Sequence, residues 1–302
     1  MRIVTRGDFD GLSSSVLLTE VERIGEIRFV HPKDAQDAKV TADAEDIVVN
    51  LPYIPGCGLW FDHHISEKDK QTPLMFKGRF EMAPSCARVI YNHYRIEHPE
   101  KGARLERFMD LLEATDRLDS AELTPEDVAR PEGWILLGLT LDPRSGLGPE
   151  FRKYFRWLVE YIKEVPIEKV LQHPEVRKRA DRVLNEQEQH KELLKQYSRL
   201  DGNVVITDFR GQRNKPVGNR FLVFTVFPSC NVEVRLFDGH QGAVVVAVGR
   251  SIFNRGCRVN VGRMLSNYGG GGHVGAGTVQ LKPEDAGAII GAIVDQLKKN
   301  EG

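Results

Sequence analysis

The stretch Leu59-Trp60-Phe61-Asp62-His63-His64 ends an apolar run in one carboxylate and two imidazoles. Its first three residues have the composition of a buried strand, as does the earlier run Ile47-Val48-Val49. Parallel strands of an α/β sheet stay apolar up to their carboxyl ends, where ligands bind. An acid and two histidines at such an end can hold a metal ion or a phosphate. A solvated loop with surface histidines would give the same pattern, so other motifs are needed to distinguish a ligand site from such a loop.

Length and composition describe an ordinary globular chain that is long enough for two domains. The chain has 302 residues, 41% hydrophobic and 28% charged, with a formal net charge of −1. This charge argues against a protein that grips long duplex nucleic acid, and no apolar run approaches the roughly 20 residues that span a membrane. The first residues lead directly into a strand pattern, which leaves no room for a signal peptide. The four cysteines show no Cys-x-x-Cys spacing, as expected for reduced thiols of a cytoplasmic protein.

Strand and helix patterns alternate in the first half of the chain. Strands are expected at residues 2–5, 27–30, 46–51 and 58–61. Helices are expected at residues 12–24, 84–94 and 104–118. This alternation predicts an α/β fold with a parallel sheet in an N-terminal domain, residues 1–150.

The second half changes character twice. Residues 151–201 are charged and helical, and a helix of about 25 residues, about 37 Å long, is expected there as a connector. Strands are then expected at residues 203–209, 221–227, 232–237 and 243–248. Helices are expected at residues 259–268 and 283–299. Together they predict a smaller α+β domain with a mixed sheet, residues 202–302.

Further acids are placed to join the site at the strand ends. Asp8 and Asp10 lie two residues apart in the turn after the first strand. Alternate residues of an extended chain point to the same side, although Asp/Gly turns of this kind are also common without a ligand. The apolar stripe of the helix at 104–118 continues to Asp116 and then Asp119. An acid on a core-facing side is costly unless it is paired or binds a cation, so we expect one of these two in the site, unless both are turn acids.

The run from Gly269 to Gly277 is the most distinctive segment of the second domain. Four consecutive glycines can expose backbone N–H groups to an oxyanion at close range. His273 follows them and adds a donor whose charge changes near neutral pH. We therefore expect an anion-binding loop made of Gly270, Gly271, Gly272 and His273. Arg250, at the end of the preceding strand, either faces the same anion or is solvated.

Taken together, these motifs resemble the DHH phosphoesterase superfamily. An Asp-x-Asp-Gly turn, an Asp-His-His motif, an acid near residues 116–119 and a Gly-Gly-Gly-His motif occur here in that family's order. The family includes RecJ-type exonucleases, oligoribonucleases, cyclic-dinucleotide phosphodiesterases and, more distantly, manganese pyrophosphatases and exopolyphosphatases. The resemblance spans nearly the whole chain. It implies a cleft between a DHH domain and a DHH-associated domain, and two manganese ions that activate water to attack a phosphoester or phosphoanhydride.

The resemblance also assigns roles to residues. The positions it implies for metal ligands are Asp8, Asp10, Asn50, His63, Asp116 and Asp119. Asp8 would serve one ion, Asp10 and His63 the other, and Asp116, or Asp119 in its place, would bridge the two. The residues implied nearest the reacting phosphate are His64, Asp62 and Arg6. His64 would approach the phosphate while Asp62 fixes its tautomer.

Two positions depart from the family pattern. Many relatives have a histidine or an acid where this chain has Arg6, and the family usually has a bridging aspartate where this chain has Asn50. Asparagine offers only a neutral oxygen, so two dications would repel each other with less compensation. The guanidinium of Arg6 would repel the first ion, or stand in for it against a phosphate. We predict one firmly bound ion, Mn²⁺ or alternatively Mg²⁺, and a second that binds weakly or not at all.

The predicted function is a manganese-dependent phosphoesterase. Its expected substrate is a small nucleotide, a short oligonucleotide or a polyphosphate, because long nucleic acids demand more basic surface. The alternative, supported by Arg6 and Asn50, is a degenerate relative that binds a nucleotide or phosphate without hydrolysis. No membrane partner is expected, and a homodimer is left open.

Overall fold

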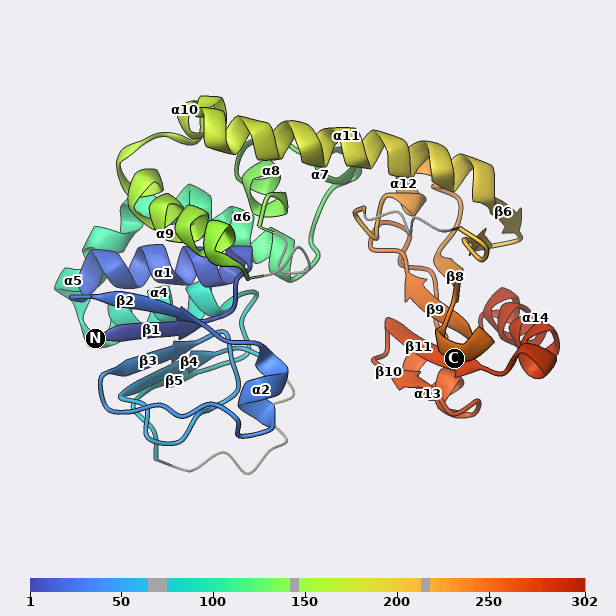
Figure 1. The fold of residues 1–302 in the computed structure, drawn as a ribbon, viewed down its shortest axis with the longest axis horizontal. Coiled ribbons are helices and arrows are strands. Elements are labelled where there is room, and N and C mark those ends of the chain that lie inside the picture. The colour runs from blue at the N-terminus through green and yellow to red at the C-terminus, as the bar shows by residue number, and fades with distance from the viewer. Residues whose placement is uncertain (65–74, 142–146, 213–217, 302) are drawn as a thin grey trace. The chain divides into compact units, whose positions relative to one another are not determined.

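The computed structural model describes residues 1–64, 75–141, 147–212 and 218–301 (Figure 1). The chain divides into two compact units, Met1–Glu122 with Pro131–Asp181, and Leu123–Arg130 with Arg182–Gly302. Each unit contains one β-sheet. Within the described ranges, no helix has the length and apolar character needed to cross a membrane.

The sheet of the first unit is entirely parallel, with strand order β2-β1-β3-β4-β5. Its strands are β1 (Arg2–Thr5), β2 (Glu26–Phe29), β3 (Asp46–Val49), β4 (Leu59–Asp62) and β5 (Gly78–Phe80). The strand order reverses at β1 and β3, which is the position where such sheets bind ligands. Because β1, β3 and β4 are neighbours, the residues that follow them emerge at one edge. The predicted α/β class is confirmed.

Helices cover one face of this sheet, where α1 and α4 pack together and α9 packs on α1 (Figure 1). The helices of the unit are α1 (Phe9–Val21), α2 (Pro32–Gln36), α4 (Cys86–Glu97), α5 (Pro99–Leu105), α6 (Met109–Asp119), α8 (Gly133–Leu139), α9 (Pro149–Glu164) and α10 (Ile167–Gln172). Helix α1 is buried along nearly its whole length, including three serines. One of these, Ser13, satisfies its hydroxyl by a 2.6 Å hydrogen bond to Thr115 of α6. This contact ties the helix that begins at the Asp-x-Asp-Gly turn to the helix that carries Asp119.

On the other face, the ring of Trp60 packs against those of Tyr53, Phe76 and Phe80. The Trp60 side chain is fully buried and packs with Val4, Val48 and Leu51. Its indole N–H donates to the carbonyl of Leu51 at 2.9 Å, so the polar atom is satisfied. Burial on both faces explains why these strands read as continuous apolar runs.

The helix expected over residues 104–118 is two helices. Proline at the first position starts α5 early, at Pro99, and a 3₁₀ turn (Glu106–Phe108) separates α5 from α6. Gly102 lets α5 approach α4 closely, since a Cβ there would lie 2.7 Å from the Cα of Arg95. The direction of α6 is therefore set independently of α5.

The second unit has a mixed six-stranded sheet, as expected, in the order β10-β11-β9-β8-β7-β6. Its strands are β6 (Ser198–Asp201), β7 (Val204–Asp208), β8 (Val232–Asp238), β9 (Val244–Arg250), β10 (Gly271–Gly272) and β11 (Ala276–Leu281). Its helices are α7 (Pro125–Ala129), α12 (Val223–Val226), a 3₁₀ turn (His240–Gly242), α13 (Val261–Ser266) and α14 (Pro283–Lys299). The apolar side chains of β7, β8, β9 and β11 pack with those of α13 and α14 in one core. Figure 1 shows where these strands and helices lie in the chain. Among the described strands of this sheet, β7 and β8 pair in parallel and the other neighbours pair antiparallel.

The expected long helix is α11 (Pro174–Tyr197), 24 residues long, and the boundary between the units falls within it. The strand expected at residues 221–227 is wrong, because the apolar residues there form the short helix α12. The side chain of Asn219 accepts a hydrogen bond from the Phe221 N–H at 3.0 Å and starts this turn. A short buried apolar run does not distinguish a strand from a helix.

Candidate metal centre

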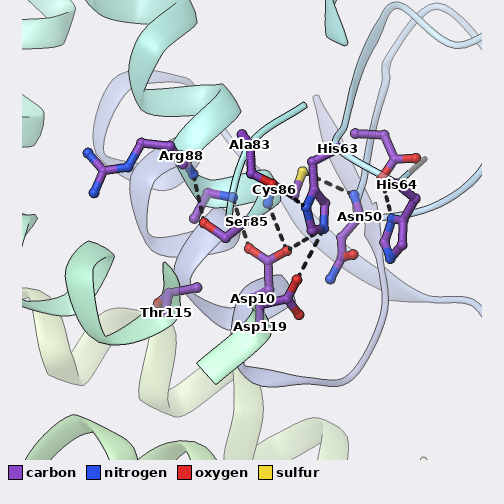
Figure 2. Close-up of polar contacts among 12 residues, drawn as sticks. Asp10, Asn50, His63, His64, Ala83, Ser85, Cys86, Arg88, Thr115 and Asp119 are labelled. Carbon is purple, nitrogen blue, oxygen red and sulfur yellow. Dashed lines mark hydrogen bonds and ion pairs between the residues drawn. The ribbon is translucent and has the colours of Figure 1, made fainter. Parts of the chain in front are cut away.

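Three side chains from distant parts of the chain meet at the carboxyl edge of the first sheet (Figure 2). Asp10 comes from the first turn of α1, His63 follows β4, and Asp119 ends α6, and their ligand atoms lie within 4.8 Å of one another. His63 Nε2 is 3.7 Å from Asp10 Oδ2 and 3.3 Å from Asp119 Oδ2. We call Asp10, His63 and Asp119 the metal cluster, because one imidazole and two carboxylates are a donor set that suits Mn²⁺ or Mg²⁺.

The ring of His63 is oriented for a ligand at Nε2. Its Nδ1 lies 3.0 Å from the carbonyl oxygen of Ala83, which fixes the proton on Nδ1 because a carbonyl can only accept. Nε2 is then a lone-pair donor, and it is buried with no hydrogen-bond partner among the residues that the structure describes. Metal-binding histidines typically donate the N–H of the other ring nitrogen to such an acceptor, which fixes the tautomer.

The carboxylate of Asp10 is held by backbone amides. It accepts hydrogen bonds from the N–H groups of Cys86 and Ala87, both at 2.9 Å, at the start of α4. Ser85 caps the same helix by accepting from the Arg88 N–H at 3.0 Å. A carboxylate at a helix N-terminus is favoured by the helix dipole, and its remaining lone pairs stay free for a cation.

Both acids of the metal cluster have raised pKa values. Burial, with a further contribution from the charge of Asp8, raises the pKa of Asp10 to about 6, although the neighbouring imidazole of His63 opposes this. Burial, together with the charges of Asp10 and Asp8, raises the pKa of Asp119 to about 8. Asp10 is buried and the side chain of Asp119 is 31% exposed, so the pair lies at the rim of the site. The two carboxylates repel each other, and a divalent cation would remove that repulsion.

Of the two α6 acids that the sequence left open, Asp119 rather than Asp116 lies with Asp10 and His63. The carboxylate of Asp116 accepts from Ser85 Oγ at 2.7 Å and from Arg88 Nε at 2.8 Å. A side chain three residues away on a helix points about 60° away around the axis, which is enough to separate the two acids. The charge of Asp116 is therefore neutralised by the guanidinium of Arg88 in α4, not by a metal ion.

The other members of the Asp-His-His motif form a pair. Asp62 is fully buried, and its Oδ1 accepts from Nδ1 of His64 at 2.7 Å. This hydrogen bond is the main reason that the pKa of His64 is raised. Nε2 of His64 points away from Asp62 and lies 3.5 Å from Nη1 of Arg6. Asp62 therefore orients the imidazole and favours its charged form.

Beside the metal cluster lies a second group, Arg6, Asp8 and Asn50, which we call the arginine cluster. Asp8 Oδ2 pairs with Arg6 Nε at 3.0 Å. Asp8 Oδ1 accepts from the Gly11 N–H at 2.9 Å and from Asn50 Nδ2 at 3.0 Å. Asn50 has a left-handed backbone (φ +55°) just after β3, a conformation that asparagine tolerates better than most residues. The expected metal ligand Asp8 is thus paired within the protein on both oxygens.

The segment around Ala83, Ser85 and Cys86 supports the metal cluster, a role that the sequence motifs did not indicate. It supplies the carbonyl that orients His63 and the amides that hold Asp10. The available signal was a helix start near Pro84, which indicated free backbone N–H groups at that point. What the sequence did not reveal is that these groups face Asp10.

In the second unit, the glycine run forms a tight hairpin. Gly271 and Gly272 of β10 pair with Thr278 and Gly277 of β11. Gly272 has φ +151°, and a Cβ there would lie 2.3 Å from the carbonyl oxygen of Ala276. The hairpin thus requires glycine for close backbone packing.

Several N–H groups of the hairpin are already used within the protein. Those of Gly269, Gly270 and His273 donate to the carbonyls of Ser266, Leu265 and Ala276. The side chain of His273 remains exposed, as does that of Val274, which is 56% exposed. The feature left for a ligand is therefore the exposed tip rather than a full row of glycine amides.

Arg250 lies next to this hairpin through its backbone, since its N–H donates to Gly275 at 2.8 Å. Its guanidinium is turned to the carbonyl of Val259, to which Nε donates at 3.0 Å. The structure therefore gives the guanidinium of Arg250 an intramolecular partner.

Comparison with known structures identifies the family. PggH from Vibrio cholerae, a pGpG-specific phosphodiesterase, is 36% identical over 99% of both chains, with a TM-score of 0.86. The chain belongs to the DHH phosphoesterase superfamily. More distant DHH structures share its fold. An exopolyphosphatase-related protein from Bacteroides fragilis is 12% identical, with a TM-score of 0.54 over 99% of this chain and 92% of that one. RecJ from Thermus thermophilus, solved in complex with Mn²⁺, is 16% identical, with a TM-score of 0.55 over 99% of this chain and 51% of that one.

No family model and no curated protein matches the sequence. The family is therefore carried by the solved structures and by the DHH motifs themselves. The resemblance drawn from those motifs is confirmed.

Proposed function

We propose that this DHH protein is a metal-dependent phosphodiesterase that cleaves short linear oligonucleotides, with a dinucleotide of the pGpG type as the substrate. The observation that carries the proposal is the 36% identity, over 99% of both chains, to a phosphodiesterase specific for pGpG. The formal net charge of −1 agrees with a small substrate.

The metal cluster would hold one divalent ion, Mn²⁺ or Mg²⁺, through Asp10, His63 and Asp119. When bound, such an ion lowers the pKa of a coordinated water and polarises a phosphoryl oxygen. The chain's own contribution is to fix the donors in advance. The Ala83 carbonyl holds the tautomer of His63, and the α4 amides hold Asp10.

His64 and Asp62 would act on the phosphate from beside the ion. Asp62 holds Nδ1 of His64, so Nε2 is the nitrogen that meets the substrate. The raised pKa of His64 keeps a proton on that nitrogen over a wider pH range, which suits a donor to a phosphate oxygen. In the second unit, the exposed His273 at the tip of the glycine hairpin is proposed separately as an anion-binding residue.

The experiment is a hydrolysis assay of purified protein with pGpG and Mn²⁺, with GMP quantified by chromatography. Cleavage of the single phosphodiester bond of pGpG yields two GMP, and chelation by EDTA abolishes it. Cyclic di-GMP, a five-nucleotide RNA and polyphosphate are the competing substrates. Release of phosphate from polyphosphate without GMP release from pGpG would contradict the proposal.

A matched pair of variants on α6 links the activity to the metal cluster. Asp119→Asn removes one acid of the cluster, whereas Asp110→Asn changes an exposed acid on the same helix. Loss of GMP release in the first variant and retention in the second are expected. Equal activity in both would show that the hydrolysis arises elsewhere.

The second candidate is a protein that binds a phosphate compound without hydrolysing it, and it is favoured by the arginine cluster. There the carboxylate of Asp8 is paired with a guanidinium and an amide. The double variant Arg6→His/Asn50→Asp restores the residue types usual in the family. GMP release that appears only in this variant would favour the binding protein, whereas release by the unchanged protein excludes it.

A further inference from the structure

We propose that the guanidinium of Arg6 takes the place of a second metal ion, and that it binds a non-bridging oxygen of the scissile phosphate while one ion is held by the metal cluster. This inference rests on the proposed phosphodiesterase function and gives it a one-metal site. It concerns three residues, Arg6, Asp8 and Asn50, whose contacts lead to it in turn.

Asp8 does not fit the role of a metal ligand here. Its Oδ1 accepts two hydrogen bonds, from the Gly11 N–H and from Asn50 Nδ2, and its Oδ2 faces Arg6 Nε at 3.0 Å. A cation at Asp8 would have to displace a charged pair and an amide donor together. The negative charge that would attract a second ion is already compensated by the guanidinium.

Asn50 turns its donor, not its acceptor, towards Asp8. The amide is fixed in this sense because a carboxylate accepts hydrogen bonds and Nδ2 is the donor. Oδ1 of Asn50 is buried and has no hydrogen-bond partner among the described residues. One neutral oxygen is a weak substitute for an anionic bridge between two dications. The site therefore has the charge for one ion and one fixed cationic side chain.

Arg6 has donors available in the right place. Nε pairs with Asp8, and Nη1 contacts Nε2 of His64, the nitrogen assigned to the substrate, at 3.5 Å. Nη2 and the second N–H of Nη1 are the donors that remain for a phosphate oxygen. The side chain is 32% exposed, so a phosphate in solution can reach it.

Arg6 belongs to the electrostatic environment of the metal cluster. Its Nη1 lies 3.5 Å from the ring of His64, and the ring centroid of His64 lies 4.4 Å from that of His63 in the metal cluster. A phosphodiester has two non-bridging oxygens and one negative charge. One oxygen would meet the bound ion and the other would meet Arg6, which positions the phosphorus between two cations without a second metal.

The test combines metal content with phosphate binding. Mn²⁺ stoichiometry is measured by elemental analysis after dialysis, and affinity for inorganic phosphate by calorimetry in the presence of Mn²⁺. The unchanged protein should hold one Mn²⁺, and Arg6→His/Asn50→Asp should hold two. Arg6→Gln should keep one Mn²⁺ but lose phosphate affinity by about 10- to 100-fold, the range of a hydrogen bond to a charged group. Arg23→Gln, which removes an exposed arginine just beyond the far end of α1, is the charge control and should match the unchanged protein.

Two Mn²⁺ in the unchanged protein, or a phosphate affinity of Arg6→Gln close to that of Arg23→Gln, would overturn the inference. Circular dichroism of each variant establishes that it is folded, and Arg6→Gln alone suffices if the double variant is not. The proposed function fails separately. If one Mn²⁺ and Arg6-dependent phosphate binding are found but pGpG is not hydrolysed, the inference stands and the phosphodiesterase proposal falls.

Discussion

The carboxyl edge of the first sheet carries two groups of polar side chains that differ in how their atoms are satisfied. In the metal cluster, an imidazole nitrogen has no partner among the described residues, and two carboxylates face it. In the arginine cluster, both oxygens of the acid already have donors from the protein. The metal cluster leaves a position for a metal cation, whereas the arginine cluster already contains a cation, the guanidinium of Arg6.

This contrast teaches that the letters of a metal-binding motif do not fix the number of ions. Asp8 and Asp10 belong to the same Asp-x-Asp-Gly turn, yet Asp10 is held by helix amides while Asp8 is held by a guanidinium. The charge of the neighbouring group determines whether a carboxylate remains available to bind a metal ion. A neutral amide orients a carboxylate and leaves its charge available, whereas an arginine consumes that charge.

The largest expected effect comes from comparing two acids of α6. Asp119→Asn should lower kcat/KM for pGpG by more than about 100-fold, since loss of a group that merely supports a metal ligand already costs 10- to 100-fold. Asp116→Asn should change kcat/KM far less, because Asp116 is paired with Arg88 and lies outside the metal cluster. Steady-state kinetics with both variants decides the matter. The reverse order of effects would place Asp116 in the site after all.

The second prediction compares the two acids of the turn. Asp8→Asn should keep the Mn²⁺ stoichiometry of the unchanged protein, because Asp8 is not a ligand in this account. It should lower kcat/KM by about 10-fold, since Arg6 loses the partner that positions it. Elemental analysis and kinetics on the same sample provide the check. A fall in bound Mn²⁺ in Asp8→Asn would count against a one-ion site.

The third prediction concerns the support of His64. Asp62→Asn should lower kcat by about 10- to 100-fold, as observed for groups that orient a reacting or ligating histidine. KM and bound Mn²⁺ should stay unchanged, because Asp62 touches neither the ion nor the substrate in this assignment. The split between kcat and KM separates an orienting role from a general loss of folding. A parallel loss of Mn²⁺ would instead make Asp62 part of the metal centre.

The smallest effect concerns a contrast between two buried histidines. His63 faces two carboxylates, whereas both ring nitrogens of His190 in α11 lack partners among the described residues. Burial, with a smaller effect of Arg235, lowers the pKa of His190 to about 4. Below pH 6.5, the ordinary pKa of histidine, and above about pH 4, His190 binds a proton in the unfolded chain but not in the folded protein. The folded protein therefore becomes less stable as the pH is lowered.

Between pH 7 and pH 5 the free energy of unfolding should fall by about 2 kcal/mol through His190. Urea unfolding at both pH values measures this fall, and His190→Leu should reduce it. If the variant does not fold, an NMR titration of the unchanged protein gives the pKa of His190 directly. A pKa near 6.5 would contradict the expectation.

The sequence was sufficient for four strands of the first unit's sheet and for the motif order, whereas strand β5 (Gly78–Phe80) was not predicted. The strands of this sheet are apolar on both faces because both faces are covered, and the polar residues after them mark the carboxyl ends. It left Asp116 and Asp119 unresolved, because the direction of α6 depends on a 3₁₀ turn that periodicity does not reveal. The pairing of Arg6 with Asp8 is likewise a matter of side-chain direction, which residue spacing does not determine.

The glycine run shows a different limit. The sequence indicated that the backbone of the glycine run could approach a ligand. In the structure, the absence of Cβ atoms instead lets strands β10 and β11 lie close together. A glycine needed for packing and a glycine needed for a ligand look the same in a sequence. The exposed tip at His273 and Val274 is a feature that only the folded hairpin defines.

The most direct test of the central claim is an anomalous diffraction map, recorded at the manganese edge, from crystals grown with excess Mn²⁺. The account predicts one strong peak between Asp10, His63 and Asp119, with Arg6 still paired to Asp8. A second peak of similar height beside Asp8, with the guanidinium displaced, would contradict it.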